Sequence, residues 1–406
     1  MVNLWYLPSE FFWKRFNVKN SACLFSGRAL KGVMAFLLAL LVPVTMAAEP
    51  ASAARQPANA DSVARLMAGL EPSDSAHKAL AESKVWQTHS AAMIASWTKV
   101  RDGQLAGMQA WRSKELPGGC PVGNTLLYPF SGPDFLNAFA LFPACTTTVM
   151  FGLEPVGRLP DPSAMNSAHF AQSLTAARNA MANIFERNYF VTNTMRRNLH
   201  GEQLRGVVPV LTMSMVYAGL EVVSVQPAPM VKPGGDKAKI NGVSIEYRSP
   251  GGKGGGRVLY YPVDLSDKGL SGHPEALDYI RGFKPSTTLL KAASYLMHIR
   301  EFSQIRQALL ETSGFLLQDD TGIPYRHLVK QGFAVTPYGT YKKPIPPFEP
   351  QYQQSLMDFY RSSQPQALPF RFGYHTSLAE NRSVLMIARL KPQEKPVSAG
   401  DAASGR

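Results

Sequence analysis

Three short segments carry the polar side chains whose types and spacing suit them for chemistry. The first is Tyr128–Phe135, in which an apolar run turns at Gly132 and a helix is expected to follow. Ser131, Gly132 and Asp134 would line a ligand pocket at the carboxyl end of a strand, where a helix N-terminus also attracts anions. Glu154 ends the next apolar run and is expected at the same edge. The alternative role for Asp134 is to cap the helix.

A cofactor alternative follows from the same segment. A strand, a tight turn, a helix and an acidic residue ending the second strand resemble the first half of a nucleotide- or S-adenosylmethionine-binding fold. The glycine signature of those folds is missing, because Gly132 is the single glycine in a turn that needs two or three. The sequence therefore predicts no cofactor.

The second segment is Lys291–His298. Lys291, Ser294, Tyr295 and His298 are spaced i, i+3, i+4 and i+7. We expect a helix over residues 285–310, capped by Ser286 or Thr287, so that one helix face would carry all four side chains. That face could be an acid/base cluster, or its polar groups could simply bond to neighbouring loops.

The third segment is Gln318–Arg326, where an apolar strand runs into Asp319 and Asp320. Adjacent carboxylates at a strand end can bind a cation or act as an acid/base pair, with Arg326 nearby. Asp-Asp-Thr-Gly is equally an ordinary turn sequence. The alternating ligands of a calcium loop are missing, so no metal is predicted. His169, Tyr374 and His375 are isolated in the sequence and are interpreted as surface or core residues.

The compartment in which this chemistry would occur is indicated by residues 28–48. Arg28 and Lys31 precede an apolar run of about 13 residues, which is shorter than a membrane span. Small residues follow, and they predict cleavage of a signal peptide near Ala47 or Ala53. A retained anchor or a buried helix is the alternative. The sequence thus predicts a periplasmic or secreted protein.

The cysteines support an oxidising compartment. After the expected leader the chain contains Cys120 and Cys145, each just before an apolar run. If the two runs are parallel strands, both cysteines lie at the same edge of the sheet, and we expect them to form a disulfide bond.

The charge is basic but spread along the chain. Lys and Arg number 42 against 29 Asp and Glu, a net charge of +13, without a long basic run. A nucleic-acid interface would need clustered cations with aromatic residues beside them. The sequence therefore predicts no nucleic-acid partner and at most a peripheral contact with membranes.

The order of the expected helices and strands predicts an α/β fold with a mixed sheet and helices packed on it. Residues 122–160 are expected to form a parallel β-α-β unit, and residues 370–374 and 384–390 a closing hairpin. Further helices are expected over 164–198 and 207–217, and strands over 221–225, 243–247, 257–263 and 315–317. The organisation we expect is a leader (1–48), a flexible linker (49–60), a helical segment (61–116), an α/β domain (117–390) and a disordered tail (391–406).

Four segments together resemble a family of exported bacterial proteins without an assigned function. They are YPFSGPDF (residues 128–135), LEPVG (153–157), KAASYLMH (291–298) and QDDTGIPYR (318–326). The resemblance covers about residues 120–375, and it carries over no catalytic residue because no activity is established for that family.

The hypothesis that fits these patterns is an exported protein that binds a small molecule or an envelope component at its strand-end loops. The candidate ligand-binding residues are Ser131, Gly132, Asp134, Glu154, Lys291, Tyr295, His298, Asp319, Asp320 and Arg326. The alternatives are an envelope hydrolase that uses Asp319 and Asp320, and a degenerate methyltransferase-like fold kept for interaction.

Overall fold

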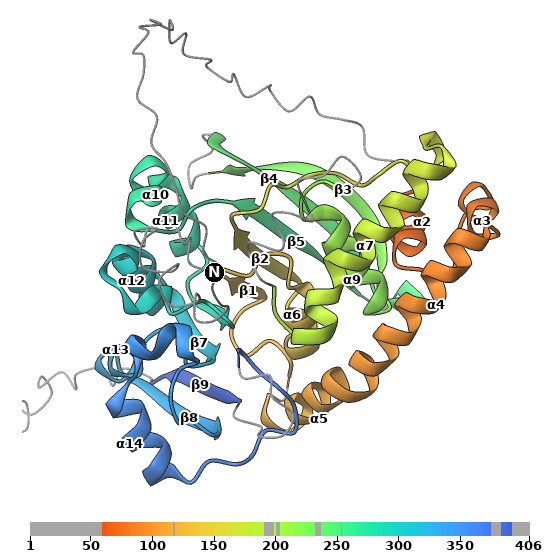
Figure 1. Ribbon diagram of the computed structural model, residues 1–406. Coiled ribbons are helices and arrows are strands. Elements are labelled where there is room, and N and C mark those ends of the chain that lie inside the picture. The colour runs from red at the N-terminus through yellow and green to blue at the C-terminus, as the bar shows by residue number, and fades with distance from the viewer. Residues whose placement is uncertain are drawn as a thin grey trace, which may run out of the picture. The chain divides into compact units, whose positions relative to one another are not determined.

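Parallel strands form the centre of the molecule. In the part of the chain that the structure describes, nine strands form one mixed sheet in the order β3-β4-β5-β2-β1-β6-β7-β9-β8 (Figure 1). The strands β5, β2, β1, β6 and β7 are parallel, and the outer strands are antiparallel. Their bounds are β1 Thr125–Tyr128, β2 Thr147–Gly152, β3 Glu221–Val231, β4 Lys237–Arg248, β5 Gly255–Pro262, β6 Ser286–Leu290, β7 Ser313–Gln318, β8 Phe333–Gly339 and β9 Val384–Leu390.

This computed structural model describes residues 59–116, 118–190, 199, 204–231, 237–252, 254–374 and 383–391. The expected leader, nearly all of the expected linker, His375 and all but residue 391 of the expected tail lie outside these ranges. Among the described residues, no helix is both long enough and apolar enough to cross a bilayer.

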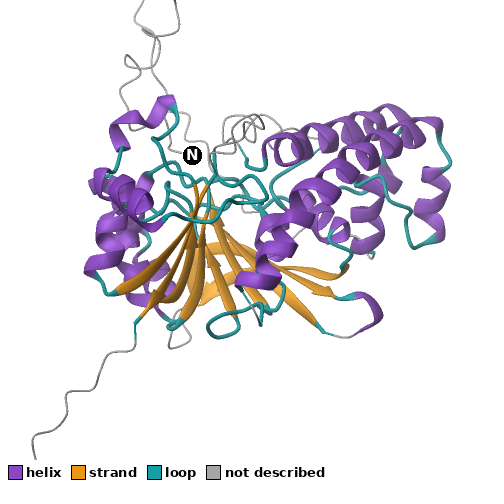
Figure 2. Cartoon of the chain, turned by 90° about the horizontal axis from the view of Figure 1, so that it is seen from below, coloured by secondary structure: helices purple, strands orange, loops and turns teal. Residues whose placement is uncertain are grey.

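Helices cover both faces of the sheet, as Figure 2 shows from below. One group packs together around α9 and the β3 side of the sheet: α2 Ala60–Met67, α3 Ser75–Ala81, α4 Lys84–Lys99, α5 Ala106–Glu115, α6 Phe135–Leu141, α7 Ser167–Arg187 and α9 Val208–Tyr217. The other group is α10 Asp267–Gly272, α11 Pro274–Arg281, α12 Ser303–Thr312, α13 Tyr325–Lys330 and α14 Gln354–Ser363. This arrangement confirms the predicted α/β class, with its parallel pair and its helical N-terminal region.

Helix α9 explains how the first group is held together. Every residue of Val208–Tyr217 is buried, and the helix contacts α2, α6, α7 and β3. A helix that is apolar on all sides belongs in the interior of a large domain. Trp97 of α4 stacks on Tyr217 at the end of α9, with ring centroids 4.7 Å apart. The predicted helix over 207–217 is confirmed.

The predicted β-α-β unit is also confirmed. Strand β1 pairs in parallel with β2, with Leu127 opposite Val149, and α6 connects them. Cys120 and Cys145 precede the two strands and are joined in a disulfide bond with an S–S distance of 2.01 Å. The bridge predicted from the parallel arrangement is therefore present.

Two predictions about elements are wrong. Residues 285–310 do not form one helix: 286–290 are the fully buried strand β6, followed by a loop, the 3₁₀ turns Leu296–His298 and Arg300–Phe302, and α12. The run Thr287-Thr288-Leu289-Leu290 is inserted between β1 and β7, where β-branched and apolar side chains fit a strand buried on both faces.

The closing hairpin is the second error. Residues 370–374 form no strand, and β9 pairs instead with β7 and β8, with Thr336 of β8 opposite Ile387. The irregular, Pro/Tyr-rich appearance of residues 337–350 concealed the end of β8. Pro337 is accommodated there because β8 is the edge strand of the sheet.

The bridge gives a stability prediction. Closing a loop of sequence separation 25 is expected to stabilise the fold by about 3 kcal/mol, because it restricts the unfolded chain. Reduction, or the double substitution Cys120→Ser with Cys145→Ser, should therefore lower the free energy of unfolding in urea by about that amount. Dithiothreitol should leave the double variant unchanged. Equal urea midpoints for the oxidised and reduced forms would contradict the prediction.

Candidate functional site

The candidate site lies between the neighbouring strands β1 and β6, whose following loops lead to different helix groups. The loop after β1 leads to α6 in one helix group, and the loop after β6 leads to α12 in the other. Strands β1 and β6 are neighbours, so their loops diverge at one point on the carboxyl edge of the sheet. Such a switch point is where open α/β sheets bind ligands. It is also where the first and second candidate segments meet.

A buried ion pair connects the two loops. The Lys291 ammonium donates to Asp134 Oδ2 at 2.8 Å, and the two side chains are 1% and 3% exposed. Lys291 also donates to the carbonyl oxygen of Asn188, which caps the C-terminus of α7 in the left-handed conformation. Loops after β1, β6 and α7 are thereby fixed to one another.

Both oxygens of Asp134 accept further hydrogen bonds. Tyr128 donates its hydroxyl to Oδ2 at 2.8 Å, and Asn137 donates its amide to Oδ1 at 2.8 Å. Burial and the neighbouring Asp134 carboxylate raise the pKa of Tyr128 well above its usual value, so the phenol keeps its proton and acts as a donor. Asp134 occupies the N-cap position of α6, but its side chain makes no capping hydrogen bond.

The carboxylates after β7 hold the loop after β6. Asp319 accepts from Ala292 N at 2.8 Å, from Thr321 N at 2.9 Å and from the Thr321 hydroxyl. Asp320 accepts from the hydroxyl of Tyr295. Both aspartates are almost fully buried, at 0% and 1% exposure. Burial, and then the adjacent Asp320, raise the pKa of Asp319 to about 6.

The loop after β6 has an unusual backbone. Ala292, Ser294 and Tyr295 have φ values of 52°, 54° and 54°, although none of them is glycine. Residues other than glycine occupy this left-handed region at a cost, and they concentrate at functional sites. The bonds from Ala292 and Tyr295 to the two aspartates hold the loop in this conformation.

Aromatic side chains cover the loop. The Tyr374 hydroxyl donates to Ala292 O at 2.8 Å and shares a hydrogen bond of 2.6 Å with Ser294 Oγ. The Tyr374 ring packs edge-on against Tyr189 at 4.9 Å and stacks on Phe348 at 5.8 Å. These three rings are half-buried and form the part of the site that faces solvent.

The backbone just before Tyr374 packs against Asp319. The preceding residue, Gly373, has a φ of 68°, and a Cβ atom built on it would lie 2.3 Å from Asp319 Oδ2. Glycine is needed here for both its conformation and its size. The interpretation of Tyr374 as an isolated residue is therefore wrong.

His298 and Glu154 are two further candidate residues whose side chains contain buried polar atoms. The His298 ring packs edge-on against Tyr295 at 5.0 Å, and burial lowers its pKa to about 4. Its Nε2 atom is buried without a hydrogen-bond partner among the described residues. Glu154 Oε2 accepts from Leu153 N at 3.2 Å and would lie 2.7 Å from a Cβ atom built on Gly152, and burial raises the pKa of this carboxyl.

The structure separates the other predicted residues by role. Ser131 bonds to the Phe151 carbonyl through its amide (2.9 Å) and its hydroxyl (3.2 Å), so it fixes the turn rather than facing a ligand. Arg326 is exposed on α13. Tyr295 and His298 do come together, but in the loop and the 3₁₀ turn after β6 and not on a helix face, whereas Lys291 bonds to Asp134 and Asn188. Asn188, Tyr189 and Phe348 were missed, since contacts between distant segments leave no pattern in the sequence. Thr321 was also missed, although it stands in the Asp-Asp-Thr-Gly turn and bonds to Asp319 two residues away.

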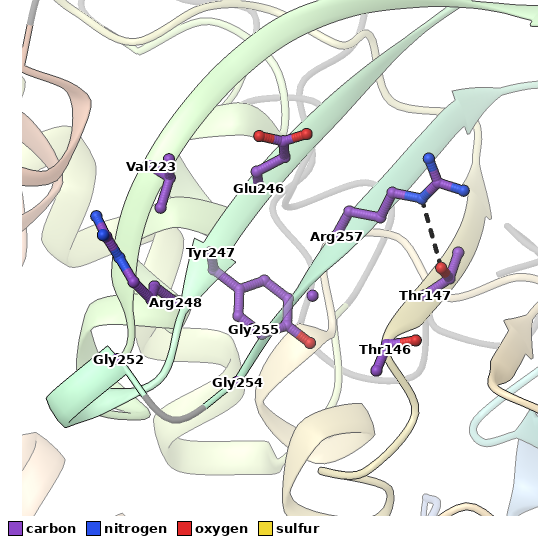
Figure 3. Close-up of a pocket in the computed structure, with 11 residues that line it drawn as sticks. Thr146, Thr147, Val223, Glu246, Tyr247, Arg248, Gly252, Gly254, Gly255 and Arg257 are labelled. Carbon is purple, nitrogen blue, oxygen red and sulfur yellow. Dashed lines mark hydrogen bonds between the residues drawn. The ribbon is translucent and has the colours of Figure 1, made fainter.

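A separate hollow lies at the opposite edge of the sheet, beside the β4–β5 hairpin (Figure 3). Its volume is about 530 Å³ and it is open to solvent. Arg248 is paired with Glu221 at 2.9 Å, and Glu246 lies opposite Arg257 across the strands. Glu246 accepts from the Ser224 hydroxyl and Arg257 donates to the Thr147 hydroxyl, so these charged groups already have partners and the hollow is the weaker candidate.

Comparison of the chain with known protein families, with curated proteins and with solved structures finds no match in any of the three. Within the described residues, no group of three or more His, Cys, Asp or Glu side chains is arranged to hold a metal ion. The assignment of the site therefore rests on its geometry.

The ion pair gives a prediction about coupling. Lys291→Met should lower the free energy of unfolding by about 3 to 5 kcal/mol, because it leaves the Asp134 charge buried without its counterion. Adding Asp134→Asn should recover part of this loss, and a double-mutant cycle in urea measures the coupling. Additive effects of the two substitutions would show that the pair is not coupled.

The aspartate pair gives a prediction about pH. The pKa of Asp319 is raised in the folded state, so its contribution to stability is present below about pH 4 and is lost as the pH rises through about 6. The stability of the wild type relative to Asp319→Asn should fall by up to about 3 kcal/mol over this range. The free energy of unfolding of the variant must be subtracted from that of the wild type at each pH. The lowered pKa of His298 changes the stability of both proteins in the opposite direction, and the subtraction removes this effect. Parallel pH profiles of the two proteins in urea unfolding would contradict it.

Proposed function

We propose that this protein is an exported ligand-binding protein whose site is the edge where the loops after β1, β6 and β7 meet. The observation that carries the proposal is the convergence of Asp134, Lys291, Asp319 and Asp320 at this switch point, beside three non-glycine residues held in the left-handed conformation. Buried titratable groups with a perturbed pKa and a constrained backbone are features of functional sites.

The surface available to a ligand is aromatic. Tyr189, Phe348 and Tyr374 come from three distant segments and pack together above the loop that starts at Lys291. Flat apolar rings that carry hydroxyl groups suit a small ligand that has an apolar face and a rim of hydroxyl groups. A sugar ring of an envelope component has this chemistry.

Binding is favoured over hydrolysis by the state of the aspartates. Asp319 already accepts three hydrogen bonds, and the Tyr295 hydroxyl occupies Oδ2 of Asp320. A general acid must reach the atom that it protonates, and both carboxylates are buried beneath the loop. Their geometry therefore supports a structural task, which is to fix the loop that carries the aromatic surface.

Export is proposed on two grounds. One is the signal-like pattern of residues 28–48, with its positive flank and short apolar core. The other is the Cys120–Cys145 disulfide bond, since such bonds persist in oxidising compartments outside the cytosol.

The binding surface is tested by a thermal-shift screen with monosaccharides, amino sugars and short cell-wall glycan fragments. At least one compound should raise the melting temperature of the wild type, because a ligand that binds the folded state stabilises it. Tyr374→Ala should abolish that shift and weaken binding in calorimetry by at least about tenfold, which corresponds to 1.4 kcal/mol.

The matched control is Tyr352→Ala, which removes an exposed aromatic ring outside the site. It should keep the shift unchanged. A panel in which no compound binds, or a shift that survives Tyr374→Ala, would contradict the proposal.

A further inference from the structure

The long helical stretch formed by α4 and α5 contains one turn of a different winding. Residues Val100–Leu105 join the two helices as a π-helical turn. Such turns are rare, and they often occur at functional sites. Gln104 lies in this turn and is 9% exposed, so its amide is nearly removed from solvent. A buried amide needs hydrogen-bond partners inside the protein.

Gln104 has these partners on the backbone of Arg371, 267 residues further along the chain. Its Nε2 atom donates to Arg371 O at 2.6 Å, and its Oε1 atom accepts from Arg371 N at 3.0 Å. Nε2 also contacts Met108 Sδ at 3.3 Å. One side chain therefore holds both polar backbone groups of a single distant residue, which fixes the position and the orientation of that residue.

The same helical stretch packs against the two preceding residues, Pro369 and Phe370. A Cβ atom built on Gly107 would lie 3.0 Å from Pro369 O and 3.3 Å from Phe370 Cβ, so the helix approaches this part of the chain closely. The Trp111 ring meets the Phe370 ring edge-on, with centroids 5.7 Å apart. The bonds from Gln104 thus belong to a packed contact between two segments that are far apart in the sequence.

The carbonyl group of Arg371 is also connected to the candidate site. Asn188 Nδ2 donates to it at 3.1 Å, and the carbonyl oxygen of Asn188 in turn accepts from Lys291. The next residue, Tyr189, packs edge-on against Tyr374 at 4.9 Å. This one carbonyl therefore links the N-terminal helices to the aromatic surface.

Two residues separate Arg371 from Tyr374, and both are fixed in place. Phe372 N donates to Ser383 Oγ at 2.8 Å, and Gly373 has the left-handed backbone and the close contact described above. A segment this short and this well bonded has no slack. A shift of the backbone at Arg371 must therefore move the Tyr374 ring or break the bonds that hold it.

We infer that Gln104 is a positioning residue for the aromatic surface formed by Tyr189, Phe348 and Tyr374. The inference rests on the proposed function, in which this surface contacts the ligand. Gln104 does not touch the ligand itself. It holds Arg371 so that the Tyr374 ring is in place before the ligand arrives, and such preorganisation lowers the entropy lost on binding.

The first test needs no ligand. Gln104→Met keeps the length of the side chain and removes both bonds to Arg371. In protein labelled with 3-fluorotyrosine, the fluorine resonance of Tyr374, assigned through Tyr374→Phe, should shift or broaden in this variant. Gln109→Met makes the same change at an exposed position of α5 and should leave the resonance unchanged. Identical Tyr374 resonances in the wild type and in Gln104→Met would overturn the inference.

The second test is calorimetry with the compound that gives the largest thermal shift. Gln104→Met should weaken binding by about fivefold, whereas Gln109→Met should bind as the wild type does. Equal binding by the wild type and both variants would overturn the inference alone, and no binding by the wild type would contradict the proposed function on which it rests.

A second pair of variants covers a failure of Gln104→Met to fold. Gln104→Glu keeps the size of the side chain and an acceptor for Arg371 N, but its ionised carboxylate cannot donate to Arg371 O. It should change the Tyr374 resonance and the affinity in the same direction, with Gln109→Glu as its control. A resonance and an affinity equal to those of the control would again overturn the inference.

Discussion

The ion pair between Lys291 and Asp134 is the constraint on which the rest of the site depends. It joins the loop after β1 to the first residue after β6, and the same ammonium group binds the carbonyl at the end of α7. A buried charge is costly unless it is paired and hydrogen-bonded, and here every oxygen of Asp134 and the ammonium of Lys291 have partners. Two loops that diverge toward opposite faces of the sheet are thus fixed at their common origin.

The aspartates after β7 extend this constraint to the strained loop. Asp319 and Asp320 hold Ala292, Thr321 and Tyr295, and the loop in turn supports Tyr374. The consequence is a rigid polar base with half-exposed aromatic rings above it. Such preorganisation reduces the entropy that a ligand must lose on binding, since the contacting groups are already ordered.

The sequence predicted the elements that have strong local signals. The apolar runs after Cys120 and Cys145 and the turn at Gly132 placed β1, α6 and β2, and the parallel pairing then predicted the disulfide bond. It failed at β6, because Thr287–Leu290 is a short run beside residues with helical spacing, and its strand position depends on insertion between β1 and β7. Lys291, Tyr295 and His298 were chosen as candidates for their chemical types, but the helix face on which they were expected does not exist. Tyr374 and Asn188 reach the site through long-range contacts that no local pattern reports.

The most direct test of the account is hydrogen–deuterium exchange of the protein with and without the compound that gives the largest thermal shift. The amides of Ala292 and Thr321 are bonded to a buried carboxylate, so they should exchange slowly in the free protein. The ligand should slow exchange further in residues 291–298 and 318–322, the segments beneath the aromatic surface. Protection confined to the β4–β5 hairpin, with these two segments unchanged, would contradict the claim that the switch point is the binding site.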